Sequence, residues 1–325
     1  MLPQFNYVRA QSLEEAQQQL STEGARICAG GSDLLGCLRD DVFDCLKVVS
    51  ISSLNQLRGI ARSSDGGIRI GALTPIAEVA ANLTLREIYP GLSQAASEVA
   101  SPQLRNQGTI GGNICQKPRC WYYRGEFHCL RKGGTTCYAL TGESQYHCIL
   151  GGYRCYIVHP SDTAPALAAL GATVHISGPR GSRTVPLDEF HVPPRDDPQR
   201  ETVLQDGEIV TEIALPPPPA GLRSSYRKVR ARGSWDFALA GVALALAFDG
   251  DQVVGGRIVL SGAAPVPWRS REAENAVIGR RIDATTARQA AAAAMQGATA
   301  LKRNAYKIPL FEGVIEEQLL AIARV

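Results

Sequence analysis

The sequence predicts a mixed α+β (α/β) fold whose last third is a separate α+β domain with a small antiparallel sheet. Short apolar runs of strand length alternate with helix-period segments through most of the first 219 residues. Beyond residue 220, long strand-like runs flank an Asp249-Gly250 turn, and alanine-rich helical sequence closes the chain. A length of 325 residues suits one large domain or two to three small ones, and a hydrophobic content of 45% is enough for their cores.

Residues 1–57 are predicted to form a first α/β subdomain. Ser12-Leu13-Glu14-Glu15 has the pattern of a capping box, which predicts a helix through Leu20. A strand, a glycine turn, a helical turn and a second strand are expected at Arg26–Cys28, Ala29–Asp33, Leu34–Leu38 and Lys47–Ile51.

Residues 58–219 are predicted to form a second subdomain, interrupted by a cysteine-rich segment at about 115–158. Strands are expected at Ile68–Ile70, Thr173–Ile176 and Glu208–Leu215. Helices are expected from Pro75, over Leu85–Ala100 with a break at Pro90-Gly91, and over Thr163–Leu170. Thr109–Asn113 reads as a glycine turn, and Pro216–Pro219 as an extended linker.

Residues 220–325 are predicted to form the C-terminal domain. Its strands are expected at Ser225–Arg230, Phe237–Phe248 and Gln252–Leu260, before two closing helices.

Charge and hydropathy exclude some classes of function. A formal net charge of +3, with scattered basic residues, does not favour nucleic acid as the main partner. No stretch approaches the roughly twenty apolar residues of a membrane span, and Met1–Ala16 does not resemble an export signal. We therefore expect a cytoplasmic protein.

Two glycine turns, Ala29–Asp33 and Thr109–Asn113, could cradle a pyrophosphate. Glycine lets the backbone approach a ligand closely, and exposed N–H groups at a helix start suit an anion. Each turn alone could equally be structural. Gly31 and Gly36 have P-loop spacing, but Cys37 and Leu38 replace the required lysine and hydroxyl residue. Any dinucleotide must therefore be held in another way.

Six of the nine cysteines lie between Cys115 and Cys155. In a reducing compartment such a cluster favours metal ligation over disulfides, and an iron-sulfur cluster tolerates long, irregular spacing. Four thiolates could come from Cys120, Cys129, Cys137 and Cys155. Zinc is the second hypothesis, because the close Cys-x-x-Cys pairs of zinc sites are absent. Burial as small hydrophobic residues is the third, and it is our prediction for Cys28, Cys37 and Cys45.

Three segments carry a resemblance to a known family: Ala29–Leu34, Gln103–Asn113 and His159–Asp162. In this order and spacing, the chain resembles the FAD-binding medium subunit of the molybdenum hydroxylases. That family includes xanthine dehydrogenase, carbon monoxide dehydrogenase and bacterial aldehyde oxidoreductases. The resemblance implies a two-part FAD-binding domain of the PCMH/CO dehydrogenase flavoprotein type, followed by the C-terminal domain of that flavoprotein.

The resemblance also implies a set of flavin-binding residues. The two glycine motifs would hold the FAD pyrophosphate, and Asp162 and Lys228 would lie towards the flavin. The full set is Ile27, Cys28, Ala29, Gly30, Gly31, Ser32, Asp33, Leu34, Thr109, Gly111, Gly112, Asn113, Asp162, Val210 and Lys228. We identify no acid–base or nucleophilic triad and so predict no catalytic residue.

The cysteine-rich segment resembles an insertion found in part of this family. Members such as 4-hydroxybenzoyl-CoA reductase and a periplasmic aldehyde oxidoreductase use it to bind an additional [4Fe-4S] cluster. The matching ligands would be Cys120, Cys129, Cys137 and Cys155. Cys148 is then spare, although it could displace Cys137, and Cys115 is a weaker candidate.

The function implied is electron transfer, because flavin accepts two electrons together and releases them singly. A large molybdenum-cofactor subunit and a small subunit with two [2Fe-2S] clusters would complete a heterotrimer, or a dimer of heterotrimers. The external partner would be ferredoxin, a quinone or NAD, and the substrate an aldehyde, an N-heterocycle or an aromatic acyl-CoA. A periplasmic location would require export with a partner subunit. A zinc-stabilised binding module and a stand-alone flavin oxidoreductase are the alternatives.

Overall fold

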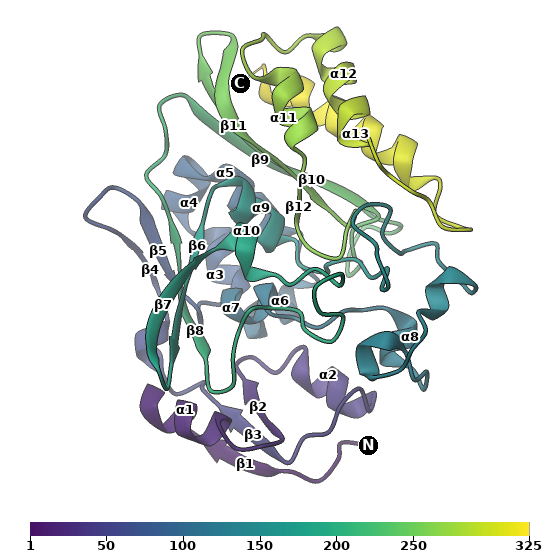
Figure 1. The fold of residues 1–325 in the computed structure, drawn as a ribbon. Helices are drawn as coiled ribbons and strands as arrows, with labels where there is room; N and C mark the ends of the chain where they lie inside the picture. The colour runs from purple at the N-terminus through teal and green to yellow at the C-terminus, as the bar shows by residue number, and fades with distance from the viewer. Residues whose placement is uncertain (325) are drawn as a thin grey trace.

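The computed structural model describes residues 1–324, which form three sheets with helices packed around them (Figure 1). The predicted mixed fold with a C-terminal antiparallel sheet is confirmed. None of the helices within these residues is long and apolar enough to cross a membrane.

The N-terminal sheet is parallel, with strand order β1-β3-β2 (Asn6–Arg9, Lys47–Ser50 and Ala25–Cys28). Helix α1 (Leu13–Leu20) packs on β2 and β3, and its start follows the predicted cap, because the Ser12 hydroxyl accepts from the Glu15 N–H at 3.1 Å. Helix α2 (Leu34–Arg39) follows the first glycine turn as predicted. Strand β1 was not predicted, since its alternation is weak and most of its residues are exposed.

The middle sheet has strand order β4-β5-β8-β6-β7. These strands are Ile60–Arg62, Ile68–Gly71, Ile209–Leu215, Thr173–Gly178 and Gly181–Pro186. The helices of this region are α3 to α7, α9 and α10, at Ile76–Ala81, Leu83–Ile88, Pro90–Ser97, Pro102–Gln107, Ile110–Ile114, Thr163–Ala169 and Leu187–Phe190; a short 3₁₀ turn, η1, spans Asn55–Leu57. Apart from α6, these helices share one large apolar core with the sheet.

Several boundaries differ from the sequence prediction. Pro75 is the residue before α3 and not its first residue. Thr109–Asn113 is not an open turn: Thr109 accepts from the Gly112 N–H and starts the short helix α7. Strands β4 and β7 were missed, because they are sheet-edge strands with mostly exposed side chains.

The cysteine-rich insert has little regular structure, only α8 (Trp121–Arg124) and the 3₁₀ turns η2 (Leu130–Lys132) and η3 (Tyr138–Leu140). It projects from one side of the molecule, where α8 is labelled in Figure 1. Packing between aromatic rings stabilises the insert. The centre of the Tyr122 ring lies 5.0 Å from that of Phe127 and 5.9 Å from that of Tyr138.

The C-terminal sheet is antiparallel, with order β12-β11-β10-β9. Its strands are Trp268–Arg269, Gln252–Ser261, Ala240–Asp249 and Leu222–Val229, and the helices on it are α11, α12 and α13 at Arg271–Val277, Ala284–Ala294 and Lys307–Ile322. We predicted two closing helices, and there are three. One face of the sheet packs on these helices, whereas Tyr226, Ala243 and Val259 join the core of the middle region. The sheet therefore stabilises both parts.

Two buried polar side chains fasten the insert to the C-terminal helices. The Lys307 ammonium donates to the carbonyls of Gly262 at 2.7 Å and His147 at 3.3 Å. The Asn304 amide donates to the carbonyls of His147 and Cys148, at 3.0 and 3.1 Å. The far end of the insert is thus fixed.

Candidate functional site

A cavity of about 500 Å³ lies where the N-terminal and middle sheets meet. Both glycine motifs line it, together with the first residues of the insert and the loop between β9 and β10. Its volume falls within the range of ligand and cofactor sites, roughly 300–1,000 Å³.

Glycine is required where the two motifs touch. A Cβ atom on Gly30 would lie 1.8 Å from the carbonyl oxygen of Gln107, which no side chain can tolerate. Gly31 has a φ of +72°, a left-handed conformation that favours glycine. A Cβ on Gly111 would meet that of Ala72 at 2.8 Å. Glycine thus lets the first motif pack directly against the backbone before the second, and both motifs line the cavity.

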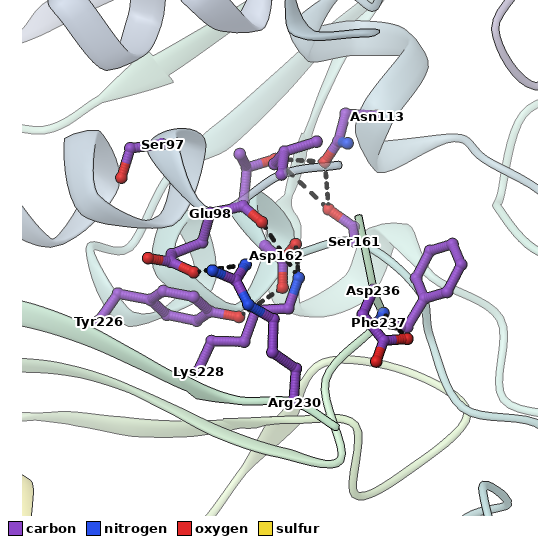
Figure 2. Close-up of polar contacts among 12 residues, drawn as sticks. Ser97, Glu98, Asn113, Ser161, Asp162, Tyr226, Lys228, Arg230, Asp236 and Phe237 are labelled. Atoms are coloured by element: carbon purple, nitrogen blue, oxygen red, sulfur yellow. Dashed lines mark hydrogen bonds and ion pairs between the residues drawn. The ribbon is translucent and has the colours of Figure 1, made fainter. Parts of the chain in front are cut away.

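Asn113 is oriented by the start of helix α9. Its side-chain oxygen accepts from the hydroxyls of Ser161 at 2.6 Å and Thr163 at 2.7 Å (Figure 2). This links the second glycine motif to the predicted His159–Asp162 motif.

Asp162 carries a buried charge network at the cavity edge. Figure 2 shows its carboxylate accepting from the Lys228 ammonium and the Tyr226 hydroxyl, both at 2.8 Å. Burial raises the pKa of Asp162, and Lys228 and Tyr226 oppose that rise. Lys228 donates also to the Glu98 carbonyl at 3.1 Å and does not line the cavity.

Most of the predicted flavin-binding residues line this cavity: Ile27, Ala29, Gly30, Gly31, Ser32, Asp33, Leu34, Thr109, Gly111, Gly112, Asn113, Asp162 and Val210. Two do not. Lys228 reaches the cavity only through Asp162. Cys28 packs beside Leu38, Cys45 and Val48. This agrees with the other prediction for Cys28, that it is a packing residue. Cys37 and Cys45 are also buried.

Sequence reasoning missed a loop at the cavity mouth. Arg232, Trp235, Asp236 and Phe237, between β9 and β10, line the cavity. The Trp235 N–H donates to the Ala100 carbonyl at 3.2 Å, and the Arg119 guanidinium lies 5.5 Å from the centre of the Phe237 ring. The sequence signal that could have indicated this loop is the pair of aromatic residues directly after Gly233-Ser234. Both aromatic side chains are partly exposed in the structure.

Asp33 joins the first glycine motif to the insert. Its carboxylate accepts from the guanidinium groups of Arg119 and Arg124, both at 2.8 Å. It also accepts from the Lys117 backbone N–H at 2.8 Å. Because Lys117 and Arg119 themselves line the cavity, the beginning of the insert is one of its walls.

A second, small cavity lies inside the insert. All four predicted ligands line it, together with His147, Arg131 and apolar or aromatic side chains; these four are Cys120, Cys129, Cys137 and Cys155. A hydrogen bond from the Cys155 thiol lowers the pKa of Cys137 to about 7. Cys148 is buried outside this cavity, and Cys115 lines the larger one.

The four thiols of the small cavity do not surround a single point at which one metal ion could bind. Within residues 1–324, no group of three or more Cys, His, Asp or Glu side chains has the geometry to hold a single metal ion. One further polar side chain approaches a thiol: the His147 Nε2 lies 3.3 Å from the Cys120 sulfur. His147 is buried, whereas His128, the other histidine of the insert, is exposed.

Two buried histidines, His159 and His191, pack against each other and line neither cavity. The rings of His159 and His191 are 4.3 Å apart, and His191 Nε2 donates to the Ile114 carbonyl at 2.9 Å. Burial lowers the pKa of His191 to about 4 and holds that of His159 well below its ordinary value. Both rings are therefore neutral near pH 7.

Comparison with known proteins defines the class. Residues 3–218 match the family model described as "FAD binding domain in molybdopterin dehydrogenase", and residues 224–309 match "CO dehydrogenase flavoprotein C-terminal domain". The chain therefore belongs to the family of FAD-binding subunits of molybdenum-dependent dehydrogenases.

Individual relatives agree with this assignment. The chain is 38% identical to the aldehyde oxidoreductase FAD-binding subunit PaoB of Escherichia coli K12 over 275 residues, 83% of this chain and 85% of that protein. It is 30% identical to the glyceraldehyde dehydrogenase medium chain of Sulfolobus acidocaldarius over 283 residues, 86% and 83% of the two chains. A chain of Hydrogenophaga pseudoflava carbon monoxide dehydrogenase matches with a TM-score of 0.78 at 27% identity, covering 100% of this chain and 98% of that one.

The buried histidines predict a pH dependence of stability. Unfolded histidine titrates near pH ~6.5. Since His191 binds its proton only at about pH 4 in the folded state, the unfolded chain holds more protons between these values, and stability falls as the pH falls through this window. The slope per histidine is at most about 1.4 kcal/mol per pH unit. Urea unfolding at neutral pH and at about pH 5 measures it.

His191→Gln is expected to reduce this slope, whereas His128→Gln, at an exposed position, is expected to preserve it. An unchanged slope in His191→Gln would contradict the assignment of a buried neutral ring.

Proposed function

We propose that this chain is the FAD- and [4Fe-4S]-carrying electron-transfer subunit of a molybdenum-cofactor dehydrogenase. The observation that carries the proposal is that one continuous segment, residues 115–137, lines part of the glycine-lined cavity and part of the cysteine cavity. A flavin supplies the exchange between two-electron and one-electron steps when it is bound.

The glycine-lined cavity fits FAD. The glycines of its two motifs let their backbones pack closely against neighbouring chain, and the backbone that lines the cavity suits a pyrophosphate. Lys117, Arg119 and Arg26 add positive charge on the lining, which suits the same group. Asp162, neutralised by Lys228, would present a fixed carboxylate at the other edge. These residues bind and orient the cofactor.

The cysteine cavity fits a [4Fe-4S] cluster. Such a cluster needs four thiolates, each for a different iron atom, so a set spread around a cavity suits it better than a set around a point. Apart from Arg131 and His147, the rest of the lining is apolar or aromatic and would keep water away from the cluster. The placement of Cys148 outside the cavity favours Cys137 as the ligand.

The reacting substrate would bind elsewhere. A large subunit with the molybdenum cofactor and a small subunit with [2Fe-2S] clusters would complete the enzyme, in line with relatives that are named as medium chains or subunits. Two of these relatives are named for aldehyde oxidation, so an aldehyde is the substrate class we favour over an N-heterocycle or an acyl-CoA. Ferredoxin, a quinone or NAD would exchange electrons with this chain.

The first test concerns FAD. Gly30→Ala places a methyl group 1.8 Å from the Gln107 carbonyl oxygen and must separate the two motifs. We expect FAD affinity to fall by tenfold or more, that is by at least about 1.4 kcal/mol. Fluorescence titration of FAD-depleted protein measures this.

Gly36→Ala is the matched control, because a Cβ there meets only the Arg124 side chain at an ordinary 3.6 Å. Equal FAD affinities in the two variants would argue against pyrophosphate binding by the first motif.

The second test concerns the cluster. Purified, anaerobically handled protein is expected to contain about four irons per chain and one FAD. Cys120→Ser and Cys155→Ser should each lose the iron and still bind FAD at saturating concentration, because these cysteines do not line the FAD cavity. Cys45→Ser, at a buried cysteine that lines neither cavity, should keep both cofactors.

Iron, zinc and acid-released flavin are measured in parallel. Zinc in place of iron would support a zinc-stabilised module, and FAD without any metal would refute the cluster while leaving the flavin site. Substrate turnover by the isolated chain would favour a stand-alone flavin oxidoreductase.

A further inference from the structure

Arg131 is a buried cation on the wall of the cysteine cavity. It lies two residues after Cys129, and only 6% of its surface is exposed. Its Nη2 donates to a Glu201 carboxylate oxygen at 2.5 Å and to the Arg200 carbonyl at 3.2 Å. Its Nε is buried and has no hydrogen-bond partner among the residues that the structure describes. A buried donor left without a partner is costly, which points to a partner that binds there.

Glu201 fixes the position of Arg131. One carboxylate oxygen accepts from Arg131 and the other from the Lys117 ammonium, so Glu201 bridges the two cavity walls. Burial alone would raise the pKa of Glu201, but Lys117 and Arg131 lower it below its ordinary value. The carboxylate is therefore charged near pH 7, and the guanidinium cannot turn away from the cavity without breaking this pair.

The position of Arg131 brings its charge to the thiols. Arg131 and the four predicted ligands line the same small cavity, and the Arg131 side chain is buried. A charge held there acts on a group bound in the cavity with little solvent screening.

Resting on the proposed function, we propose that Arg131 sets the reduction potential of the cluster. Its Nε–H would donate to a sulfur atom, and its charge would stabilise the added electron. Both hydrogen bonds to sulfur and net charge tune iron-sulfur potentials. Arg131 would therefore be a positioning and tuning residue: it makes reduction of the cluster easier without itself accepting electrons.

Arg154 provides a natural comparison. It directly precedes the ligand Cys155, yet it is exposed to solvent. Exposed charges are screened by water and salt, so Arg154 should have little effect on the cluster. Burial, and not proximity in sequence, separates the two arginines.

The experiment is a redox titration of the purified chain, monitored by the EPR signal of the reduced cluster. Arg131→Gln is expected to lower the potential, shifting the reduction equilibrium at least tenfold, equivalent to about 59 mV for one electron. Arg131→Lys, which keeps the charge but loses Nε, should lie between Arg131→Gln and the wild type. Arg154→Gln should shift the equilibrium by much less than tenfold.

The outcomes separate the two claims. Wild-type protein without iron would refute the cluster and this role together. Iron-loaded Arg131→Gln at the wild-type potential would refute only the role of Arg131. If Arg131→Gln loses iron, Arg131→Lys decides: a lowered potential supports the proposal, and a wild-type potential overturns it. Loss of iron from both variants, with FAD and fold retained, would make Arg131 structural and also overturn the proposal.

Discussion

The attachment of the insert to the rest of the protein depends on the hydrogen bonds that the Asp33 carboxylate accepts. It accepts from Arg119, Arg124 and the Lys117 N–H, all three at 2.8 Å, and these groups belong to the beginning of the insert. Asp33 itself belongs to the first glycine motif, immediately before helix α2. A segment with almost no regular structure is thereby held against a rigid turn. Charge-assisted hydrogen bonds of this kind are stronger than neutral ones and directional, which a segment without secondary structure requires.

Two consequences follow from this attachment. The insert becomes a wall of the large cavity through Lys117 and Arg119, and one residue further on it contributes Cys120 to the small cavity. The Lys117–Glu201–Arg131 network joins the same two walls a second time. At its far end the insert is held by Lys307 and Asn304 from the C-terminal domain. The glycine-lined cavity and the cysteine cavity are thus neighbours because one segment, fixed at both ends, lines part of each.

Local sequence patterns predicted much of the secondary structure. The capping residue Ser12, the strands on either side of the first glycine motif and the hairpin at Asp249-Gly250 depend on neighbours in sequence, and they agree with the structure. The four cysteines of the small cavity could be chosen because a resemblance fixed their spacing. The edge strands β4 and β7 could not be predicted from the sequence, because their exposed residues show little apolar alternation.

Ion-pair partners that are far apart in the chain could not be predicted from the sequence, for a physical reason. Asp33 reads as one more residue of a glycine motif, and its arginine partners follow about ninety positions later. Glu201 lies 70 residues from Arg131 in a stretch without a motif. Lys228 was expected towards the flavin, and its ion pair with Asp162, which lines the large cavity, was not predicted. Which charge pairs with which is decided by the packing of distant segments, and a single sequence does not encode that in any local pattern.

The central claim is that the insert is a shared wall, so the two sites should be thermodynamically coupled. The measurement that tests it most directly is the FAD dissociation constant of flavin-depleted protein, compared between iron-loaded protein and protein produced without iron. A structured insert positions Lys117 and Arg119, so iron-loaded protein is predicted to bind FAD several-fold more tightly. Equal dissociation constants in two equally folded preparations would contradict the claim and show that the sites are independent.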